Sequence, residues 1–384
     1  SVIDWKKTNA VAADILESLG IDLPVDTKVS ALSVGQRQMV EIAKAMSFNP
    51  KELILDEPTS ALARHETESL FKVIHSSKSK GVIVIFITHK LNEIRGVADE
   101  VIVLRDSRFI GTSAIAEATP KRSVDMMFGE VPIPKRPDAV QPSTEVTMEV
   151  RNLTREPKFS NVSFQLHKGE ILGIAGMLGS GRSELLRAIF GADPVDSGEV
   201  VIHGVTVKKP SIRSMKKLGL AMTPENRKEE GLVQILNIRD NLCHASLETI
   251  AARGFLTRKM QKPVVERWTR DLQIKAGDPE NPVSSLSGGN QQKIVVGNWL
   301  NTNPTIMFFD EPSRGIDVAA KQQIFQIMWE LSRQGMSVVF VSTELEELLE
   351  VCHRILIIKN GRIESDVIPE DLGLDELFAK CMED

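Results

Sequence analysis

One stretch of this sequence occurs twice, and the repeat constrains the possible folds more than any other feature. Residues 32–58 (LSVGQRQMVEIAKAMSFNPKELILDEP) align without a gap on residues 286–312 (LSGGNQQKIVVGNWLNTNPTIMFFDEP), an offset of 254 residues. The same offset places residues 82–88 on 336–342 and residues 101–109 on 355–363. A repeat of this length predicts two copies of one folding unit within the 384 residues.

The offset also predicts how the copies are organised. Residue 1 corresponds to residue 255, so we expect the first copy to lack the part equivalent to residues 145–254. An irregular linker is indicated by Pro120, Pro132, Pro134, Pro137 and Pro142. We therefore predict the C-terminal part of a first domain at 1–118, a linker at 119–145 and a complete second domain at 146–384.

Short apolar runs alternate with helical patterns, which predicts an α/β fold with a mostly parallel sheet. The predicted strands span residues 52–55, 82–87, 171–175, 305–309 and 337–341. Because ligands of such sheets bind at the carboxyl ends of the strands, we expect the functional residues there.

The composition narrows the possible partners. A net charge of −5 and a pI near 5.9 provide no general attraction for nucleic acid or anionic lipid. No apolar run approaches the roughly 18 residues that cross a bilayer, and the first residues do not resemble a signal peptide. Cys243, Cys352 and Cys381 match no zinc spacing and are expected to be reduced thiols. These features predict a cytosolic protein that contacts a membrane only through a partner.

A glycine-rich turn follows the predicted strand at 171–175 and precedes a predicted helix at 183–190. Such a turn directs backbone N–H groups at phosphate oxygens, and the helix N-terminus adds about half a positive charge. Arg182 stands where the pattern has lysine, and its planar guanidinium is not a point donor inside a tight loop. Alone, the turn could be purely structural. With the motifs below, it predicts nucleotide binding with little hydrolysis. The expected ligands are Gly176, Gly179, Ser180, Gly181, Arg182 and Ser183, of which Ser183 would coordinate Mg²⁺.

Each copy has an apolar strand that ends in two acids, Asp56-Glu57 and Asp310-Glu311. Carboxylates just past a buried strand are costly unless a metal ion or a reacting water uses them. We expect Asp56 and Asp310 to hold Mg²⁺ through water, and Glu57 and Glu311 to orient or deprotonate the attacking water, a role worth about 10²–10⁴-fold in rate. The alternative is a helix cap at the strand end, which the same spacing in both copies makes less favoured.

The most specific motif is the turn LSGGNQQ at 286–292, which opens a predicted helix before the second acidic pair. This arrangement resembles the signature motif of ABC ATPases. The resemblance implies that Ser287, Gly288, Gly289 and Gln291 belong to the surface that meets the γ-phosphate of an ATP held by the other domain. The first copy keeps Ser33 and Gly35 but has Val34 in place of a glycine.

The resemblance extends to three further positions. ABC ATPases place a histidine that contacts the γ-phosphate at the position of His89, although an isolated histidine is more often an ordinary surface or core residue. The second copy has Thr343 there. Glu225 stands at the glutamine-loop position. Asp317 lies in a loop that faces the other domain in this family, and its counterpart is Ala63.

Within the ABC ATPases, the chain resembles the duplicated ATP-binding subunit of ribose-, galactose- and xylose-type sugar importers. The resemblance rests on Arg182, on Ser342-Thr343-Glu344 in place of the histidine element, and on the runs LSGGNQQK (286–293) and PSRGIDV (312–318). It implies two P-loop nucleotide-binding domains, each with a parallel-sheet core and a helical signature subdomain, that use ATP and Mg²⁺ to drive monosaccharide import.

The resemblance also implies partners and a location. The chain would bind transmembrane permease subunits and, through them, a periplasmic sugar-binding protein, at the cytoplasmic face of the bacterial inner membrane. Neither nucleic acid nor direct membrane insertion is expected. The permease contact is expected near residues 225–236, where a charged run precedes four apolar residues, which could instead be core: Leu232, Val233, Ile235 and Leu236.

In ABC dimers, each ATP is held by the phosphate loop and acids of one domain and by the signature of the other. One site would therefore combine Asp56, Glu57 and His89 with the second signature. The other would combine Arg182 and Thr343 with the altered first signature. Because the departures collect on this second site, the resemblance implies one hydrolytic site and one degenerate site that mainly binds nucleotide.

Three alternatives remain at this stage. The first is an importer ATPase of the same duplicated build for a nucleoside or autoinducer. The second is a soluble ABC protein that acts on ribosomes, which the proline-rich linker and Arg182 disfavour. The third is a non-catalytic remnant that binds nucleotide weakly.

Overall fold

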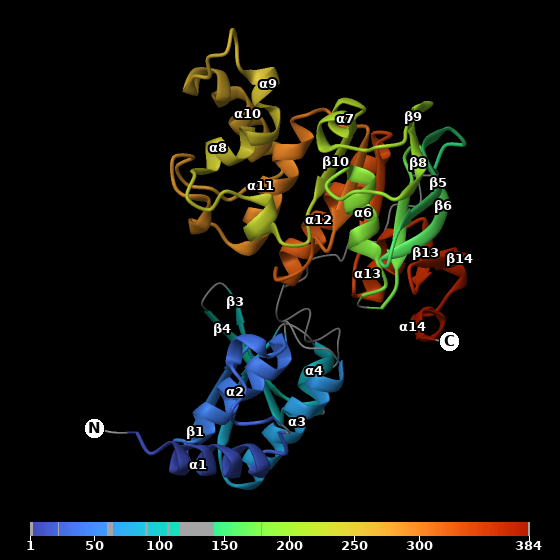
Figure 1. Ribbon diagram of the computed structural model, residues 1–384. Helices are drawn as coiled ribbons and strands as arrows, with labels where there is room; N and C mark the ends of the chain where they lie inside the picture. The colour runs from blue at the N-terminus through green and yellow to red at the C-terminus, as the bar shows by residue number, and fades with distance from the viewer. Residues whose placement is uncertain are drawn as a thin grey trace. The chain divides into compact units, whose positions relative to one another are not determined.

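The computed structural model describes residues 3–21, 23–59, 64–88, 91–105, 108–115, 142–177 and 179–382. The chain divides into two compact units, Ser1–Pro132 and Ile133–Asp384 (Figure 1). Most of the predicted linker at 119–145, together with His89 and Ala63, lies outside the described residues. None of the described helices is long and apolar enough to span a membrane.

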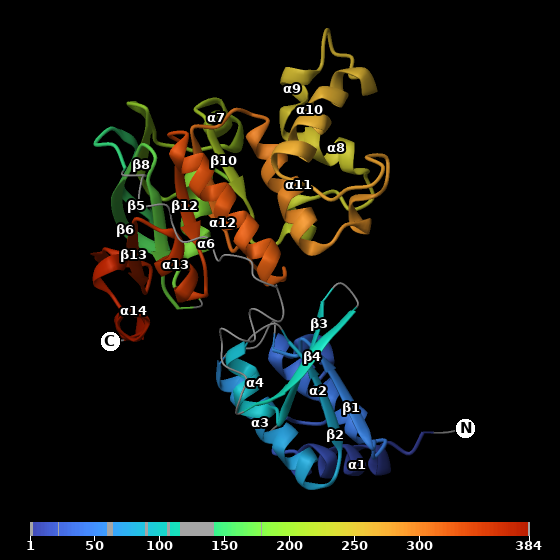
Figure 2. The same cartoon turned by 180° about the vertical axis from the view of Figure 1, so that it is seen from behind.

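The first unit combines helices with two small sheets (Figure 2). β1 pairs in parallel with β2, and β3 pairs antiparallel with β4. Leu53 and Leu55 of β1 pack with Leu70, Val73 and Ile74 of α3 in a buried cluster. The elements are α1 (Trp5–Ser18), α2 (Val34–Met46), β1 (Glu52–Asp56), α3 (Arg64–Ser79), β2 (Ile83–Ile87), α4 (Leu91–Val97), β3 (Glu100–Arg105) and β4 (Arg108–Ala114).

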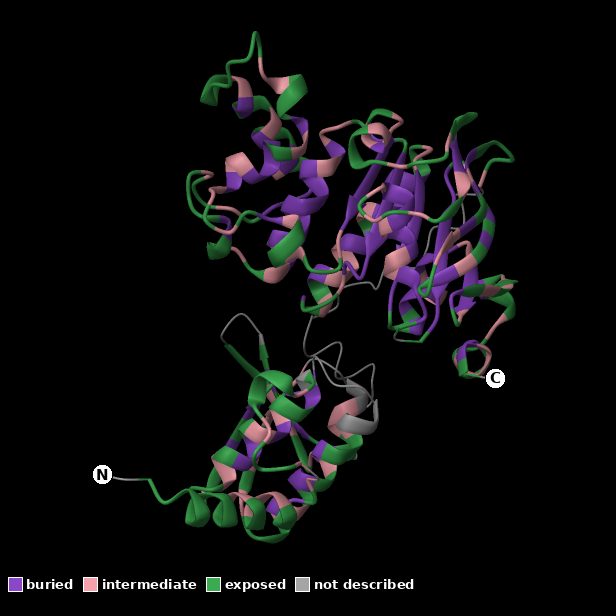
Figure 3. Cartoon of the chain, viewed as in Figure 1, coloured by how far each residue is buried: buried purple, intermediate pink, exposed green. Residues whose placement is uncertain are grey.

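The second unit is built on a six-stranded sheet of order β10-β11-β12-β7-β13-β14. Its neighbours pair in parallel except β13 and β14, which are antiparallel. The central strands are buried throughout (Figure 3). The strands are β10 (Leu220–Thr223), β11 (Ile306–Asp310), β12 (Ser337–Val341), β7 (Ile171–Ala175), β13 (Arg354–Lys359) and β14 (Arg362–Val367).

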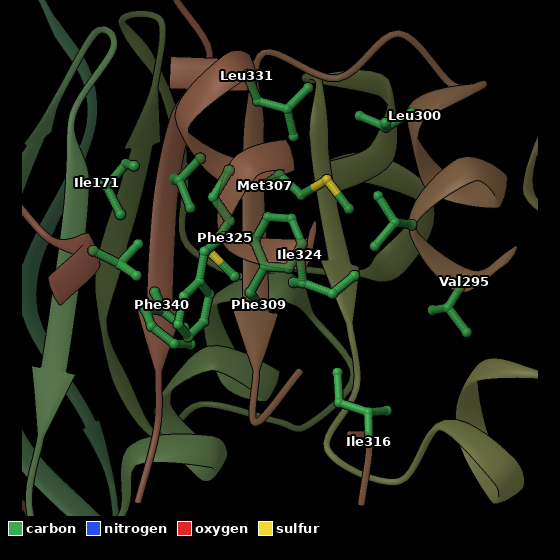
Figure 4. Close-up of a cluster of buried hydrophobic side chains, with 14 of the residues drawn as sticks. Ile171, Val295, Leu300, Met307, Phe309, Ile316, Ile324, Phe325, Leu331 and Phe340 are labelled. Carbon is green, nitrogen blue, oxygen red and sulfur yellow. The ribbon is translucent and has the colours of Figure 1, made fainter. Parts of the chain in front are cut away.

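The side chains that alternate along the strands of this sheet belong to two separate apolar clusters. In one cluster, Ile324 and Phe325 of α12 (Val318–Arg333) pack with Phe309 and Phe340 of the sheet (Figure 4). The other cluster joins the sheet to α6 (Arg182–Phe190) and to a four-stranded antiparallel sheet of order β6-β5-β8-β9. The antiparallel strands are β5 (Val146–Arg155), β6 (Phe159–His167), β8 (Ser197–Ile202) and β9 (Val205–Val207).

A group of helices projects from the sheet and ends with the predicted signature helix (Figure 1). The helix α11 begins at Gly288, directly after the signature serine. The group comprises α8 (Ile238–Cys243), α9 (Leu247–Ile250), α10 (Arg258–Asp271) and α11 (Gly288–Leu300). Further helices described in this unit are α7 (Ile212–Lys217), α13 (Leu345–Val351), α14 (Leu374–Met382) and the short helix Arg227–Gly231.

The two units share local geometry at the offset of the sequence repeat. β1 aligns Glu52 with Ile83 of β2, and β11 aligns Ile306 with Ser337 of β12, so both pairs have the same register. All five predicted strands are confirmed to within one residue at either end. Left-handed backbone recurs at equivalent positions: Asn49 and Asn303, Glu57 and Glu311, Gly81 and Gly335.

The two units differ in the strand that joins their parallel and antiparallel strand pairs, which is β7 in the second unit. In the second unit β7 pairs with both β12 and β13, whereas among the described residues of the first unit β2 and β3 belong to separate sheets. One face of the β1–β2 pair is exposed, and Ile54 is 63% exposed where the equivalent Phe308 is buried. The other isoleucines of this face are Ile83, Ile85 and Ile87.

Candidate nucleotide-binding site

The glycine-rich turn connects β7 to α6, and its glycines are required by close backbone contacts. Gly181, the N-cap of α6, has φ +95°, and a Cβ there would lie 2.5 Å from the carbonyl oxygen of Lys158. A Cβ at Gly176 would lie 2.5 Å from the carbonyl oxygen of Ile358. The Oγ of Ser180 is buried and has no hydrogen-bond partner among the described residues. The turn is therefore closely packed and contains one buried polar atom without a partner among the described residues. Gly179 is also left-handed, at φ +84°.

Ser183 and Asp310 meet at the carboxyl end of the sheet. The Ser183 hydroxyl donates a hydrogen bond of 2.9 Å to Oδ1 of Asp310. Burial raises the pKa of the Asp310 carboxyl to about 7, although the Ser183 hydrogen bond lowers it. A hydroxyl beside a carboxylate is the oxygen-rich ligand set that Mg²⁺ favours. The residues predicted as metal ligands in the second copy are thus in direct contact.

Arg182 is directed into the protein. One guanidinium nitrogen donates to the carbonyl oxygen of Ser342 at 2.8 Å, and another lies 3.8 Å from Oε1 of Glu311. Thr343 donates to Oε2 of the same carboxylate at 3.2 Å. Burial raises the pKa of Glu311, and the charge of Arg182 opposes that shift. The cation that replaces lysine is therefore occupied by protein groups.

The signature turn is shaped by the loop against which it packs. The Ser287 side chain caps α11, and the side-chain amide of Asn290 donates to its Oγ at 3.0 Å. A Cβ at Gly288 would lie 2.7 Å from a guanidinium nitrogen of Arg227, and one at Gly289 would overlap Cβ of Ala320. Both glycines are needed because neighbouring groups leave no space for a side chain.

Two other predicted ligands have structural contacts of their own. Gln291 is buried, and its amide nitrogen donates to the carbonyl oxygens of Val283 and Leu286. Asp317 caps α12 by accepting a hydrogen bond of 2.8 Å from the backbone of Ala320. These contacts explain the two residue types without a nucleotide.

The glutamine-loop position contacts the loop that follows the second acidic pair. The carboxylate of Glu225 pairs with the guanidinium of Arg314. In return, Arg227 donates to the carbonyl oxygens of Arg314 and Gly315. Burial lowers the pKa of Arg227. The sequence did not single out Arg227, since its only signal was its place in the segment that contains Glu225.

In the first unit, Asp56 ends β1 and Glu57 follows it in left-handed conformation, φ +43°. The N–H of Glu57 donates to the carbonyl oxygen of Ile87, as Glu311 does to that of Val341. Both acids of the first unit are exposed. Ser33 caps α2 through a reciprocal pair of hydrogen bonds with Gln36, and Gly35 lies in the first turn of that helix.

A family model described as "ABC transporter" matches residues 3–60 and 159–314, which contain the glycine-rich turn, both signature turns and both acidic pairs. The chain belongs to the ABC transporter family. Membership of this family implies that the protein binds ATP.

Curated relatives of this ABC protein match over nearly its whole length. The "Ribose import ATP-binding protein RbsA" of Geobacillus kaustophilus is 42% identical over 98% of this chain and 76% of that protein. The "Putative ribose/galactose/methyl galactoside import ATP-binding protein 2" of Burkholderia cenocepacia is 40% identical over 98% of this chain and 74% of that protein. The resemblance to the ATP-binding subunits of sugar importers is thereby confirmed.

The solved structures agree in fold. A nucleotide-free ATP-binding cassette from an ABC transporter matches with a TM-score of 0.52 at 20% identity, covering 61% of this chain and 94% of that one. A cassette in its ADP conformation matches with the same TM-score over 62% of this chain and 96% of that one. The predicted α/β cassette fold is confirmed.

Proposed function

We propose that this chain is the ATP-binding subunit of a transporter that imports a monosaccharide of the ribose and galactose class. The observation that carries this proposal is the similarity to sugar-import ATP-binding proteins over 98% of the chain. The glycine-rich turn and the Ser183–Asp310 contact support a role for ATP.

The residues of the second unit fit Mg-ATP. Gly176 and Gly181 let the turn pack against the carbonyl oxygens of Ile358 and Lys158, and Ser180 has a buried hydroxyl oxygen without a partner among the described residues. Ser183 and Asp310 are the residues that would hold Mg²⁺. When bound, Mg²⁺ neutralises charge on the phosphates.

We propose that this site binds nucleotide but hydrolyses it poorly. Lysine at the position of Arg182 would present a point charge to the phosphates, whereas the Arg182 guanidinium is held by Ser342 and Glu311. Glu311 is 6% exposed and Thr343 donates a hydrogen bond to its Oε2, so its access to an attacking water is restricted.

We propose that the two units are tandem cassettes of one type, the first represented by its C-terminal part. The shared register and the left-handed Glu57 and Glu311 support this organisation. Hydrolysis would then depend on Asp56 as Mg²⁺ ligand, on Glu57 as the group that activates water and on His89 as a phosphate contact.

The proposed partner is a membrane permease, which would hold this protein at the cytoplasmic face of the inner membrane, and through the permease a periplasmic sugar-binding protein. The four apolar residues after Glu225 differ in burial: Leu232 is 7% exposed, Val233 is 37% exposed and Ile235 is 89% exposed. Leu236 has intermediate exposure. Val233 and Ile235 are therefore the apolar residues that a partner could cover.

Reconstitution tests the proposed function. The complete transporter, with its permease and binding protein, would be placed in vesicles, and ATP-dependent uptake of labelled ribose, galactose, xylose and a nucleoside would be compared. We expect uptake of a monosaccharide. Uptake of the nucleoside alone would contradict the sugar assignment and favour the nucleoside importer.

A further inference from the structure

Glu347 on α13 joins two loops at the nucleotide site. Its Oε2 accepts hydrogen bonds from the hydroxyls of Ser313, at 2.7 Å, and Ser342, at 2.8 Å. Its Oε1 pairs with Lys321 of α12 at 3.1 Å, and the side chain is 3% exposed. One buried carboxylate thus connects the loop after the acidic pair to the loop after β12.

The first unit contains the same two hydroxyl contacts, whereas Thr67 stands at the position equivalent to Lys321. Oε2 of Glu93 on α4 accepts hydrogen bonds from the hydroxyls of Thr59, at 2.7 Å, and Thr88, at 3.2 Å. All three residues stand at the offset of 254 from the corresponding residues of the second unit. Both donors are threonines in the first unit and serines in the second, and the acceptor is a glutamate in both.

The two serines that Glu347 joins lie next to residues of the proposed nucleotide site. Ser313 follows Glu311 by two positions, and the carbonyl of Ser342 accepts the hydrogen bond from Arg182. Thr343, the next residue, donates to Glu311. Moving either loop would therefore displace Glu311 and its partners relative to each other.

The corresponding neighbours in the first unit are Glu57 and His89. Thr59 follows Glu57 by two positions, and Thr88 directly precedes His89. The contact therefore fixes the segment that follows Glu57 relative to Thr88, the residue after β2.

We infer that Glu347 and Glu93 are positioning residues, each of which holds the loop after the acidic pair at a set distance from the loop after the next strand. This inference rests on the proposed function, because it takes Glu57 as the residue that activates water. A link that only stabilised α13 or α4 would affect folding but not the rate of the chemical step.

Hydrogen–deuterium exchange of the full chain tests the contact itself. We expect Glu347→Ala to accelerate exchange at residues 313–314 and 342–344 by about tenfold or more. Without the carboxylate, these two loops can open while the rest of the unit stays folded. The matched control is Glu350→Ala, on the same helix, which removes a hydrogen bond to Gln322 at 3.1 Å and leaves both loops joined. Equal exchange of both variants at these loops would overturn the inference, whether or not the chain binds nucleotide.

Steady-state kinetics of the assembled transporter test the positioning role. We expect Glu93→Ala to lower kcat by about tenfold to a hundredfold with KM nearly unchanged, because a misplaced reacting group loses rate on this scale. Glu93→Gln should recover most of the rate, since its amide oxygen still accepts hydrogen bonds from the hydroxyls. Wild-type kcat in Glu93→Ala would overturn the inference, whereas a wild-type transporter without ATPase activity would contradict the proposed function.

Discussion

The Arg182 guanidinium lies 3.8 Å from the carboxylate of Glu311, and both side chains are only 6% exposed. The residue that should face the phosphates is thus paired with the residue that should activate water. We propose that this one contact accounts for weak hydrolysis at the site of the second unit.

Removing one member of this pair should destabilise the second unit. We expect Arg182→Ala to lower the free energy of unfolding by about 3–5 kcal/mol, because Glu311 remains buried without its cation. Adding Glu311→Gln should recover part of the loss. Urea unfolding measures both, with the exposed Arg213→Ala as the control, expected to change stability by no more than about 0.5 kcal/mol. An Arg182→Ala loss no larger than that of the control would show that the pair contributes nothing.

The two glutamates after the strands should differ in importance. In the assembled transporter, we expect Glu57→Gln to lower sugar uptake by about a hundredfold or more and Glu311→Gln by less than about threefold. The reason is that Glu311 is already engaged by Arg182 and Thr343. Labelled sugar uptake into vesicles measures the difference, and an equal loss from both substitutions would contradict a single hydrolytic site.

The signature glycines should not tolerate a methyl group. We expect Gly289→Ala to destabilise the second unit by about 1–3 kcal/mol, because its Cβ would overlap that of Ala320. Gly277→Ala is the matched control, since the nearest atom to its Cβ would be 3.9 Å away. Thermal or urea unfolding of the two variants provides the comparison. Similar stabilities would mean that α11 and α12 can separate at little cost.

The exposed part of the segment at 225–236 should bind the permease. We expect Ile235→Lys to leave folding unchanged, since this side chain is 89% exposed, and to abolish co-purification with the permease. Leu232→Lys should instead destabilise the protein, because Leu232 is 7% exposed. Retention of the permease by a folded Ile235→Lys protein would place the contact elsewhere.

The three cysteines should react slowly in the native protein. All are buried, and burial raises the pKa of Cys243 to about 11, so about one thiol in a thousand is ionised there at pH 8. We expect Ellman's reagent to label them rapidly only after denaturation. Val205→Cys, at a position 49% exposed, serves as the reactive control. If the three native cysteines of the folded protein react faster than the Val205→Cys thiol, the core must open.

The sequence predicted the elements well because their signals are local or repeated. The strand at 83–87 follows from an apolar run, the start of α11 at Gly288 follows from the LSGG turn, and both agree between the two copies. The orientation of Arg182 could not be predicted, because it depends on a carbonyl oxygen 160 residues away. Glu347 was missed for a similar reason: a glutamate on a helix has no pattern that identifies two hydroxyl partners.

The apolar run at 232–236 shows a further limit. Leu232 and Ile235 are chemically similar, but Leu232 is 7% exposed and Ile235 is 89% exposed, since the irregular segment before α8 has no regular period. Whether such a residue lies in the core or on the surface depends on tertiary packing, which cannot be predicted from composition.

The exposed face of β1 and β2 affects how the first unit behaves in solution. Ile54, Ile83, Ile85 and Ile87 form an apolar strip beside a strand edge that pairs with no other described strand. Unpaired edges with apolar side chains are templates on which other extended chains add. We therefore expect a concentrated preparation of this polypeptide to self-associate through this strip.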